Sequence, residues 1–196
     1  ARPVLASVLP ILKKPFRYLA FRVVAFSTVW AVLALVVIAT IISTLFRQAS
    51  ERGFESLLTA HLFNLISSVG VDADGRLSGS PNLGDLRFTI PNSGWYWSVE
   101  PVSEDVKGRL QSLSLTGDLP SPPTDEFPFN SDYQRSYLAD GLDGETIEVF
   151  ESEFVLAGEN SIARFRVMGN RTELEEDIAS FERQLYLSLL IFGLGM

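Results

Sequence analysis

A run of twenty-four residues without a charge, Val23–Phe46, constrains this chain more than any other feature. As a helix it would extend roughly 36 Å, at about 1.5 Å per residue, which is enough to cross the apolar core of a bilayer. A core helix of a soluble protein is rarely this long and this uniformly apolar. A cleaved signal peptide usually has an apolar part of only about 7–15 residues, and Leu45-Phe46-Arg47 is a poor cleavage site. The run therefore predicts an uncleaved transmembrane helix over residues 23–46.

The charges on its two sides predict its orientation. Residues 1–22 contain five basic and no acidic residues: Arg2, Lys13, Lys14, Arg17 and Arg22. All 24 acidic residues lie between Glu51 and Glu182. Because basic flanks stay on the cytoplasmic side, we expect residues 1–22 to form a cytoplasmic arm and residues 47–184 to form a domain outside the membrane.

The composition of residues 47–184 limits what this domain can be. Its length is close to the commonest size of a single domain, so it can bury its own core. The chain has no cysteine, which excludes disulfides, thiol chemistry and Cys-based metal sites. Its excess of acid argues against binding of nucleic acid, which needs a basic surface. Cations, basic peptides or a basic partner protein remain compatible with it.

A second apolar run begins at Leu185 and continues to Met196. Twelve residues cannot span a bilayer. The chain starts at Ala1, not at Met, and ends while the apolar pattern is still running. We therefore expect a piece of a longer protein, with residues 185–196 as the truncated start of a second transmembrane helix. A short amphipathic C-terminal helix is the alternative.

The helical period continues beyond the first apolar run. Apolar residues recur at steps of three and four from Phe54 to Val69, which predicts one helix from the membrane to about Ser68. The single histidine, His61, lies on or beside this apolar face. We interpret it as a partly buried helix residue, and its alternative role would be a ligand or a pH sensor.

A strand and a turn follow, and after them an aromatic segment. Val69–Leu77 is predicted to be a short strand followed by an Asp-Gly turn. Phe88 and Ile90 alternate with polar residues, and so do Trp95, Trp97 and Val99, which predicts a hairpin. Its loop would be Asn92-Ser93-Gly94, with the glycine in the left-handed conformation.

The aromatic segment also holds the candidate ligand residues. These candidates are Arg87, Trp95, Tyr96 and Trp97. The tryptophans could form one apolar face of a sheet, or they could form the aromatic wall of a ligand pocket. Both interpretations stay open from the sequence.

The next segments are less regular. Thr116–Asn130 is rich in Pro, Asp and Ser and is expected to be a loop. Lys107–Leu115 is ambiguous between a strand and a short helix, and so is Asp132–Gly141.

Two strands, Glu145–Leu156 and Ser161–Val167, are predicted near the end of the domain. A two-residue turn at Gly158-Glu159 would place Glu153 opposite Arg164 and Glu151 opposite Arg166.

Asn170 then resembles a helix N-cap, with Glu173 three residues later. Apolar residues at heptad-like spacing lead from Leu174 into the second apolar run. Both membrane-proximal helices would thus carry apolar stripes, which suggests a homodimer or packing onto the domain's own sheet.

Seven acidic residues lie between Asp140 and Glu159, with no basic residue before Arg164. If several share one sheet face, a divalent cation or a basic partner would relieve their repulsion. Glu151 and Glu153, which point to the same side of a regular strand, are the weak candidates for a metal site. A solvated acidic surface is the alternative.

The stretch Arg87-Phe88-Thr89-Ile90-Pro91-Asn92-Ser93-Gly94-Trp95-Tyr96-Trp97 resembles a segment of alphaproteobacterial membrane sensor histidine kinases of the FeuQ and PhoQ-like group. This resemblance implies an α+β fold, a PAS-like antiparallel sheet flanked by helices, in the periplasm of a bacterium and anchored in its inner membrane. It also implies a small periplasmic ligand or partner protein. The cytoplasmic kinase, its ATP and its response regulator would lie outside this chain, and no catalytic residue can be transferred to it.

The sequence shows no catalytic signature of its own. It lacks a Gly-x-Ser-x-Gly motif, a phosphate-binding glycine loop and a histidine pair. The first hypothesis is therefore a signal-input domain. The alternatives are the ectodomain of another receptor, such as a chemoreceptor or cyclase, and a membrane-anchored structural or assembly protein. The residues that follow Met196 in the gene would separate them.

Overall fold

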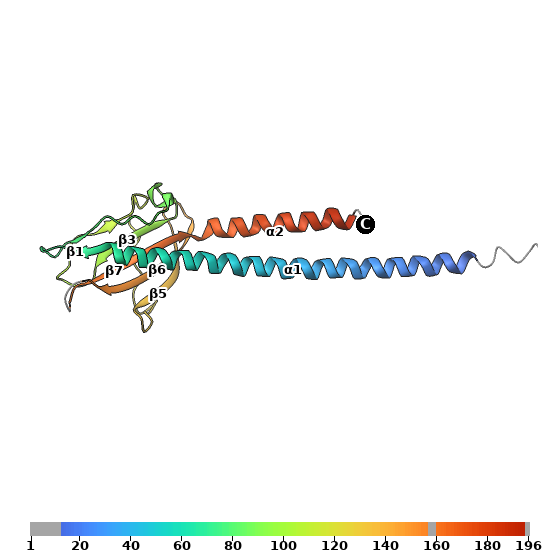
Figure 1. The fold of residues 1–196 in the computed structure, drawn as a ribbon, viewed down its shortest axis with the longest axis horizontal. Coiled ribbons are helices and arrows are strands. Elements are labelled where there is room, and N and C mark those ends of the chain that lie inside the picture. Colours follow the sequence, from blue (N-terminus) through green and yellow to red (C-terminus); the bar gives the residue numbers. More distant parts are fainter. Residues whose placement is uncertain (1–12, 157–159, 195–196) are drawn as a thin grey trace, which may run out of the picture. The chain divides into compact units, whose positions relative to one another are not determined.

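The computed structural model describes residues 13–156 and 160–194 and has an α+β fold (Figure 1). The order of elements is α1 (Lys13–Ser68), β1 (Val69–Val71), β2 (Leu77–Gly79), the 3₁₀ helix η1 (Leu86–Thr89), β3 (Tyr96–Pro101), β4 (Leu110–Gln111), β5 (Gln134–Asp140), β6 (Thr146–Val155), β7 (Ile162–Asn170) and α2 (Arg171–Leu194). The chain divides into two compact units, residues 1–47 with 180–196 and residues 48–179. Each unit is described by itself.

The first unit contains the apolar part of α1 and the later part of α2. The rings of Phe46 and Phe181 stack with centroids 3.8 Å apart. The Ser43 hydroxyl donates a hydrogen bond of 2.7 Å to Glu182, whose carboxylate lies 3.7 Å from Arg47. Among the described residues, one helical stretch is long and apolar enough to cross a membrane, and it lies within α1 near the N-terminus. Its side chains are mostly exposed, as expected of a membrane anchor or signal sequence and not of a core helix.

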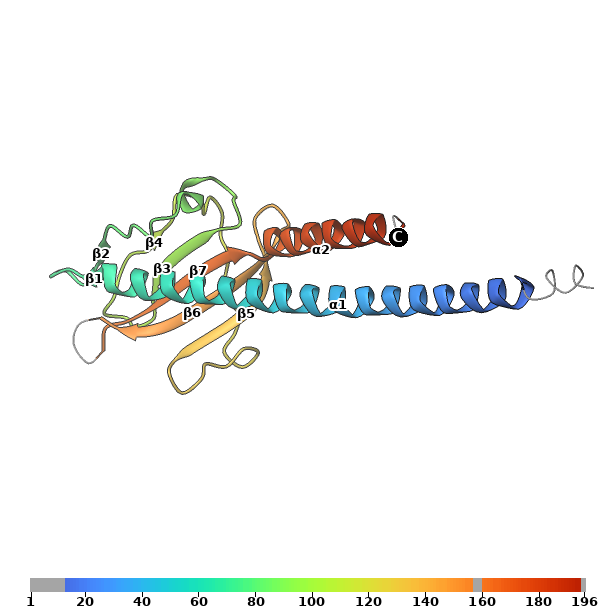
Figure 2. The same cartoon turned by 45° about the vertical axis from the view of Figure 1, so that its right-hand side comes forward.

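In the second unit, the end of α1 lies across one face of a sheet (Figures 1 and 2). The helix ends at Ser68, as its apolar period predicts. The side chains of Phe54, Leu58, Leu62 and Leu65 form a stripe at helical spacing and are almost fully buried. They pack against the side chains of β3 and β7, and this contact is the main core of the unit.

The sheet has five antiparallel strands in the order β4-β3-β7-β6-β5. Glu151 pairs with Arg166 and Glu153 pairs with Arg164, so the predicted register of β6 and β7 is confirmed. The turn expected at Gly158-Glu159 lies outside the described residues.

The two faces of the sheet bury different residues. Trp97 and Val167 face α1, whereas their neighbours Tyr96 and Met168 face the opposite side. The expected loop Thr116–Asn130 covers part of that second face, where the backbone oxygen of Leu119 accepts a hydrogen bond from Arg166.

Four local expectations have a definite outcome. The strand expected at Phe88 and Ile90 is wrong, because η1 forms there: Asp85 caps this helix by accepting a hydrogen bond from the Arg87 amide. Gly94 does have a left-handed conformation, with φ of 80°. Asp132–Gly141 contains strand β5, and Lys107–Leu115 contains only the two-residue strand β4.

Candidate functional site

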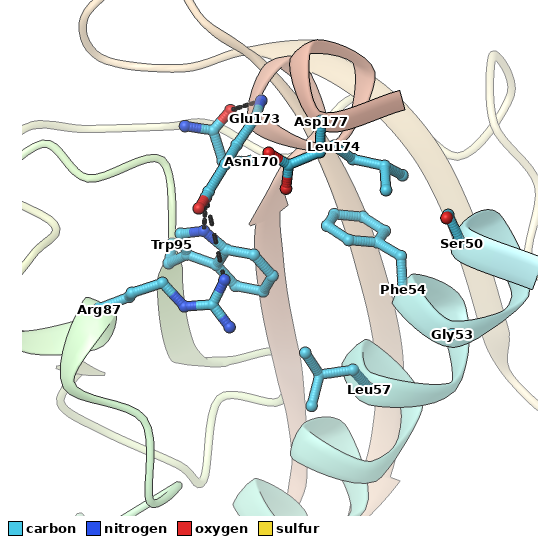
Figure 3. A pocket seen from close by; sticks show the side chains of 10 residues that line it. All are labelled: Ser50, Gly53, Phe54, Leu57, Arg87, Trp95, Asn170, Glu173, Leu174 and Asp177. Atoms are coloured by element: carbon cyan, nitrogen blue, oxygen red, sulfur yellow. Dashed lines mark hydrogen bonds and ion pairs between the residues drawn. The ribbon is translucent and has the colours of Figure 1, made fainter. Parts of the chain in front are cut away.

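A cleft of about 260 Å³ opens beside the end of β7, within the second unit. Four groups of residues line it: Ser50, Gly53, Phe54 and Leu57 from α1, Arg87 from η1, Trp95 before β3, and Asn170, Glu173, Leu174 and Asp177 from the end of β7 and the start of α2. Figure 3 shows Phe54 and Leu57 pointing from α1 toward Trp95. Residues of both helices thus line the cleft, and the indole ring of Trp95 forms another of its walls (Figure 3).

Arg87 covers one face of that indole. Its guanidinium carbon lies 3.6 Å from the centre of the Trp95 ring, a distance typical of a cation–π contact. The same guanidinium binds both carboxylate oxygens of Asp85, with N–O distances of 2.6 to 3.0 Å. These hydrogen bonds hold the pKa of Asp85 below its usual value. The charge of Arg87 is thus already neutralised by a neighbour two residues away.

Glu173 connects the indole to α2. The Trp95 indole nitrogen donates a hydrogen bond of 2.8 Å to Glu173 Oε2, and Arg87 Nη1 lies 3.9 Å from the same oxygen (Figure 3). Asn170 caps the helix, because its side-chain oxygen accepts a hydrogen bond of 3.0 Å from the Glu173 amide. The predicted N-cap is confirmed, and it fixes where Glu173 enters the cleft.

Close packing holds the floor of the cleft. The Phe54 ring meets the Trp95 ring edge-on, with centroids 5.4 Å apart. Gly169 of β7 lies under both rings, and a Cβ atom there would come within 2.7 Å of Phe54 and 3.1 Å of Trp95. Only glycine allows α1 and the indole to approach the sheet this closely.

The aromatic contacts continue behind the cleft to His61. The rings of Trp95 and Phe88 are 6.3 Å apart, and those of Phe88 and His61 are 5.3 Å apart. His61 is buried, and its Nε2 atom has no hydrogen-bond partner among the described residues. Burial lowers the pKa of His61, an effect that Asp85 opposes and Arg87 reinforces.

The structure brings two of the four candidate ligand residues, Arg87 and Trp95, into this cleft and places the other two elsewhere. Trp97 packs in the core between α1 and the sheet. Tyr96 is completely buried on the opposite face, where its hydroxyl donates a hydrogen bond of 2.8 Å to Glu145. Burial and this neighbouring carboxylate raise the pKa of Tyr96 to about 12.

The candidate metal residues lie in a network of arginines on the second face. The Glu151 side chain is fully buried, and its carboxylate accepts hydrogen bonds from Arg135, Tyr137 and Ser121. Arg164 lies 3.1 Å from Glu151 and 2.7 Å from Glu153.

These arginine partners occupy the positions that a cation would need. In the part of the chain that the structure describes, no three His, Asp or Glu side chains are grouped so that they could hold a metal ion. Burial and the Glu151 charge also raise the pKa of Tyr137.

Sequence analysis missed the contribution of the two helices to the cleft. The sequence pattern places Phe54 and Leu57 in the apolar stripe of a helix and Glu173 in a helix cap, and it indicates no shared site for the three. A signal was present in the spacing of Glu173 and Asp177, which places two acids on the same side of α2 one turn apart. Nothing in the spacing could show that this side faces Trp95, because the two segments are 78 residues apart.

Comparison with protein-family models, with curated proteins and with solved structures finds no match. The function must therefore be argued from the cleft and from the helices that form it.

Proposed function

We propose that this chain is the extracytoplasmic signal-input part of a bacterial sensor histidine kinase, with a PAS-like domain in the periplasm and an anchor in the inner membrane. Residues 23–46 would form the first transmembrane helix, with the basic residues 1–22 in the cytoplasm. The kinase domain that uses ATP, the response regulator and a homodimeric arrangement belong to the same proposal. The sequence segment Arg87–Trp97 supports it through the resemblance stated above.

One observation carries the proposal: the lining of the cleft is divided between α1 and α2. α1 contains the apolar run Val23–Phe46, and α2 contains the start of the second apolar run. A molecule bound between Phe54 and Leu174 would change the contact between these helices. Since each helix continues from the cleft into an apolar segment without a break, such a change would pass along both helices.

The membrane topology is the first test. Alkaline phosphatase is active only outside the cytoplasm, so fusions after Arg22 and after Asp118 should differ. We expect activity only for the fusion after Asp118, which follows the first apolar run. Activity for neither fusion would overturn the proposal.

The second test asks whether the cleft controls a kinase. The chain is fused after Met196 to the rest of a second transmembrane helix and the cytoplasmic half of a sensor kinase that drives a transcriptional reporter. Gly53 lines the cleft, and no atom of the described residues lies within 4 Å of a Cβ built on it, so Gly53→Leu places a larger side chain at the cleft from a position with room for its Cβ. Ala49→Leu, an exposed position outside the cleft, is the matched control.

We expect Gly53→Leu to shift the reporter level and Ala49→Leu to leave it unchanged. Equal levels for both variants and the parent chain would contradict a signalling role of the cleft.

A further inference from the structure

We propose that the cleft takes a small organic cation, a primary ammonium attached to an apolar or aromatic group; this rests on the proposed function and names the ligand class of the same site. Three properties of the lining residues support this ligand class: the charges at the rim, the apolar wall and the pairing of Arg87 with Asp85.

The charges at the rim are unbalanced toward acid. Among the residues that the structure describes, Arg87 is the only basic one that lines the cleft, and Asp85 already holds it through two carboxylate oxygens. Glu173 and Asp177 add two further carboxylates from α2. Across residues 13–156 and 160–194, no hydrogen bond or ion pair involves the side chain of Asp177, which is exposed. An anionic ligand would therefore meet two carboxylates and an arginine that is already neutralised.

The two acids of α2 are spaced to share one cation. Glu173 and Asp177 are four residues apart, so their side chains lie on the same side of the helix, where like charges repel. An ammonium group between them would remove this repulsion and could donate a hydrogen bond to each carboxylate.

The wall below this rim is apolar. Phe54 and Leu57 from α1, Leu174 from α2 and the ring of Trp95 supply most of it. A fully hydrated metal ion would gain nothing from these side chains, whereas the hydrocarbon part of an amine would be removed from water. The guanidinium of Arg87 already covers one face of the Trp95 ring at 3.6 Å, so the two carboxylates of α2 are the groups left to hold the ammonium.

The size of the cleft restricts the ligand to a small molecule. Its volume of about 260 Å³ lies just below the range of about 300–1,000 Å³ usual for ligand pockets. Phenethylammonium combines the required charge with one aromatic ring and is the probe that we choose.

The test measures binding of phenethylammonium to the whole chain in lipid nanodiscs by isothermal titration calorimetry, with empty nanodiscs as the blank. 3-Phenylpropionate and 2-phenylethanol are the anionic and neutral probes of similar shape. We expect saturable binding of the ammonium at millimolar concentration and weaker binding of the other two. Asp177→Asn and Glu173→Gln should each weaken it about threefold, as expected for one partly exposed ion pair.

Glu176→Gln is the matched control, because Glu176 is exposed on the same helix and lies outside the cleft. This variant should bind like the parent chain. The proposal is overturned if the neutral or anionic probe binds as tightly, if no heat above the blank appears, or if both cleft variants bind like the parent. The Gly53→Leu reporter experiment uses no probe and tests the signalling role by itself. If Gly53→Leu shifts the reporter but phenethylammonium does not bind, the ligand class is wrong and the proposed function stands.

Discussion

The indole nitrogen of Trp95 donates a hydrogen bond of 2.8 Å to the carboxylate of Glu173, and this bond joins the residue before β3 to the first turn of α2. The same indole contacts Phe54 of α1 and Arg87 of η1. One ring thus contacts three helical segments of the second unit. Changes at this ring should therefore affect both the stability of the domain and the position of its helices.

Replacing Glu173 by alanine is expected to lower the free energy of unfolding by about 1–2 kcal/mol. The Trp95 N–H would lose its acceptor, and the first turn of α2 would lose a favourable acidic residue. Glu173→Gln keeps an acceptor oxygen and should lose less. Denaturant unfolding followed by near-UV circular dichroism measures both, with Glu176→Ala as the control. A loss as large in the control would show that the effect comes from helix charge alone.

Replacing Gly169 by alanine is expected to cost about 1–3 kcal/mol, since the added Cβ would overlap Phe54 and Leu58 on α1. Gly70→Ala is the matched strand control, because nothing lies within 4 Å of a Cβ at that position. The melting temperature should fall for the first variant only. An unchanged melting temperature for Gly169→Ala would mean that α1 can move away from the sheet at no cost.

Periodicity and charge pairing predicted the parts of this fold that are determined locally. The apolar stripe of α1 correctly predicted that the helix ends at Ser68. The alternation in β6 and β7 correctly predicted that Glu153 pairs with Arg164. The strand expected at Phe88 and Ile90 failed because a two-residue alternation is a weak signal. The cap by Asp85, which favours a 3₁₀ turn, decided the local structure instead.

The cleft could be predicted only in part, for a different reason. Arg87 and Trp95 are close in sequence and were candidates for one site. Tyr96 was grouped with them, although successive residues of a strand point to opposite faces, and it is buried on the other side of the sheet. The partners from α1 and α2 depend on how the helices pack, which a single sequence does not encode locally.

The buried carboxylate of Glu151 should be the most costly acid to remove. Its side chain is 0% exposed and that of Arg135 is 2% exposed, so alanine at position 151 would leave a buried arginine without its partner. We expect a loss of about 3–5 kcal/mol for Glu151→Ala. The ion pair of Glu153 with Arg164 is partly exposed, so Glu153→Ala should lower the free energy of unfolding by only about 1 kcal/mol. Urea unfolding compares the two, and equal losses would contradict the difference in burial.

The same network predicts the response to divalent cations. Because Arg135 and Arg164 already neutralise Glu151, millimolar magnesium or calcium should not raise the melting temperature of the chain. Glu153→Gln should give the same result as the parent chain. A rise in melting temperature that this variant abolishes would instead identify a metal site at β6.

His61 makes the stability of the domain depend on pH. Its ring packs against Phe88, and the buried Nε2 atom has no partner among the described residues, so protonation would place a charge in an apolar contact. Burial therefore lowers the pKa of His61 in the folded state below the value of about 6.5 expected when the chain is unfolded. The unfolded state then binds the proton more readily than the folded state, which means that acid favours unfolding.

The stabilisation associated with neutral His61 is complete above the unfolded pKa and is lost as the pH falls toward the folded pKa. Between about pH 7 and pH 5, the free energy of unfolding should decrease by at most about 1.4 kcal/mol per pH unit from this residue. Asp85 and Arg87 are the charged groups that act on it, and they are unchanged in His61→Leu. Urea unfolding of the parent chain and of His61→Leu at several pH values measures the difference in slope. The leucine variant should lose the part of the slope that His61 contributes, and parallel pH profiles would show that another group is responsible.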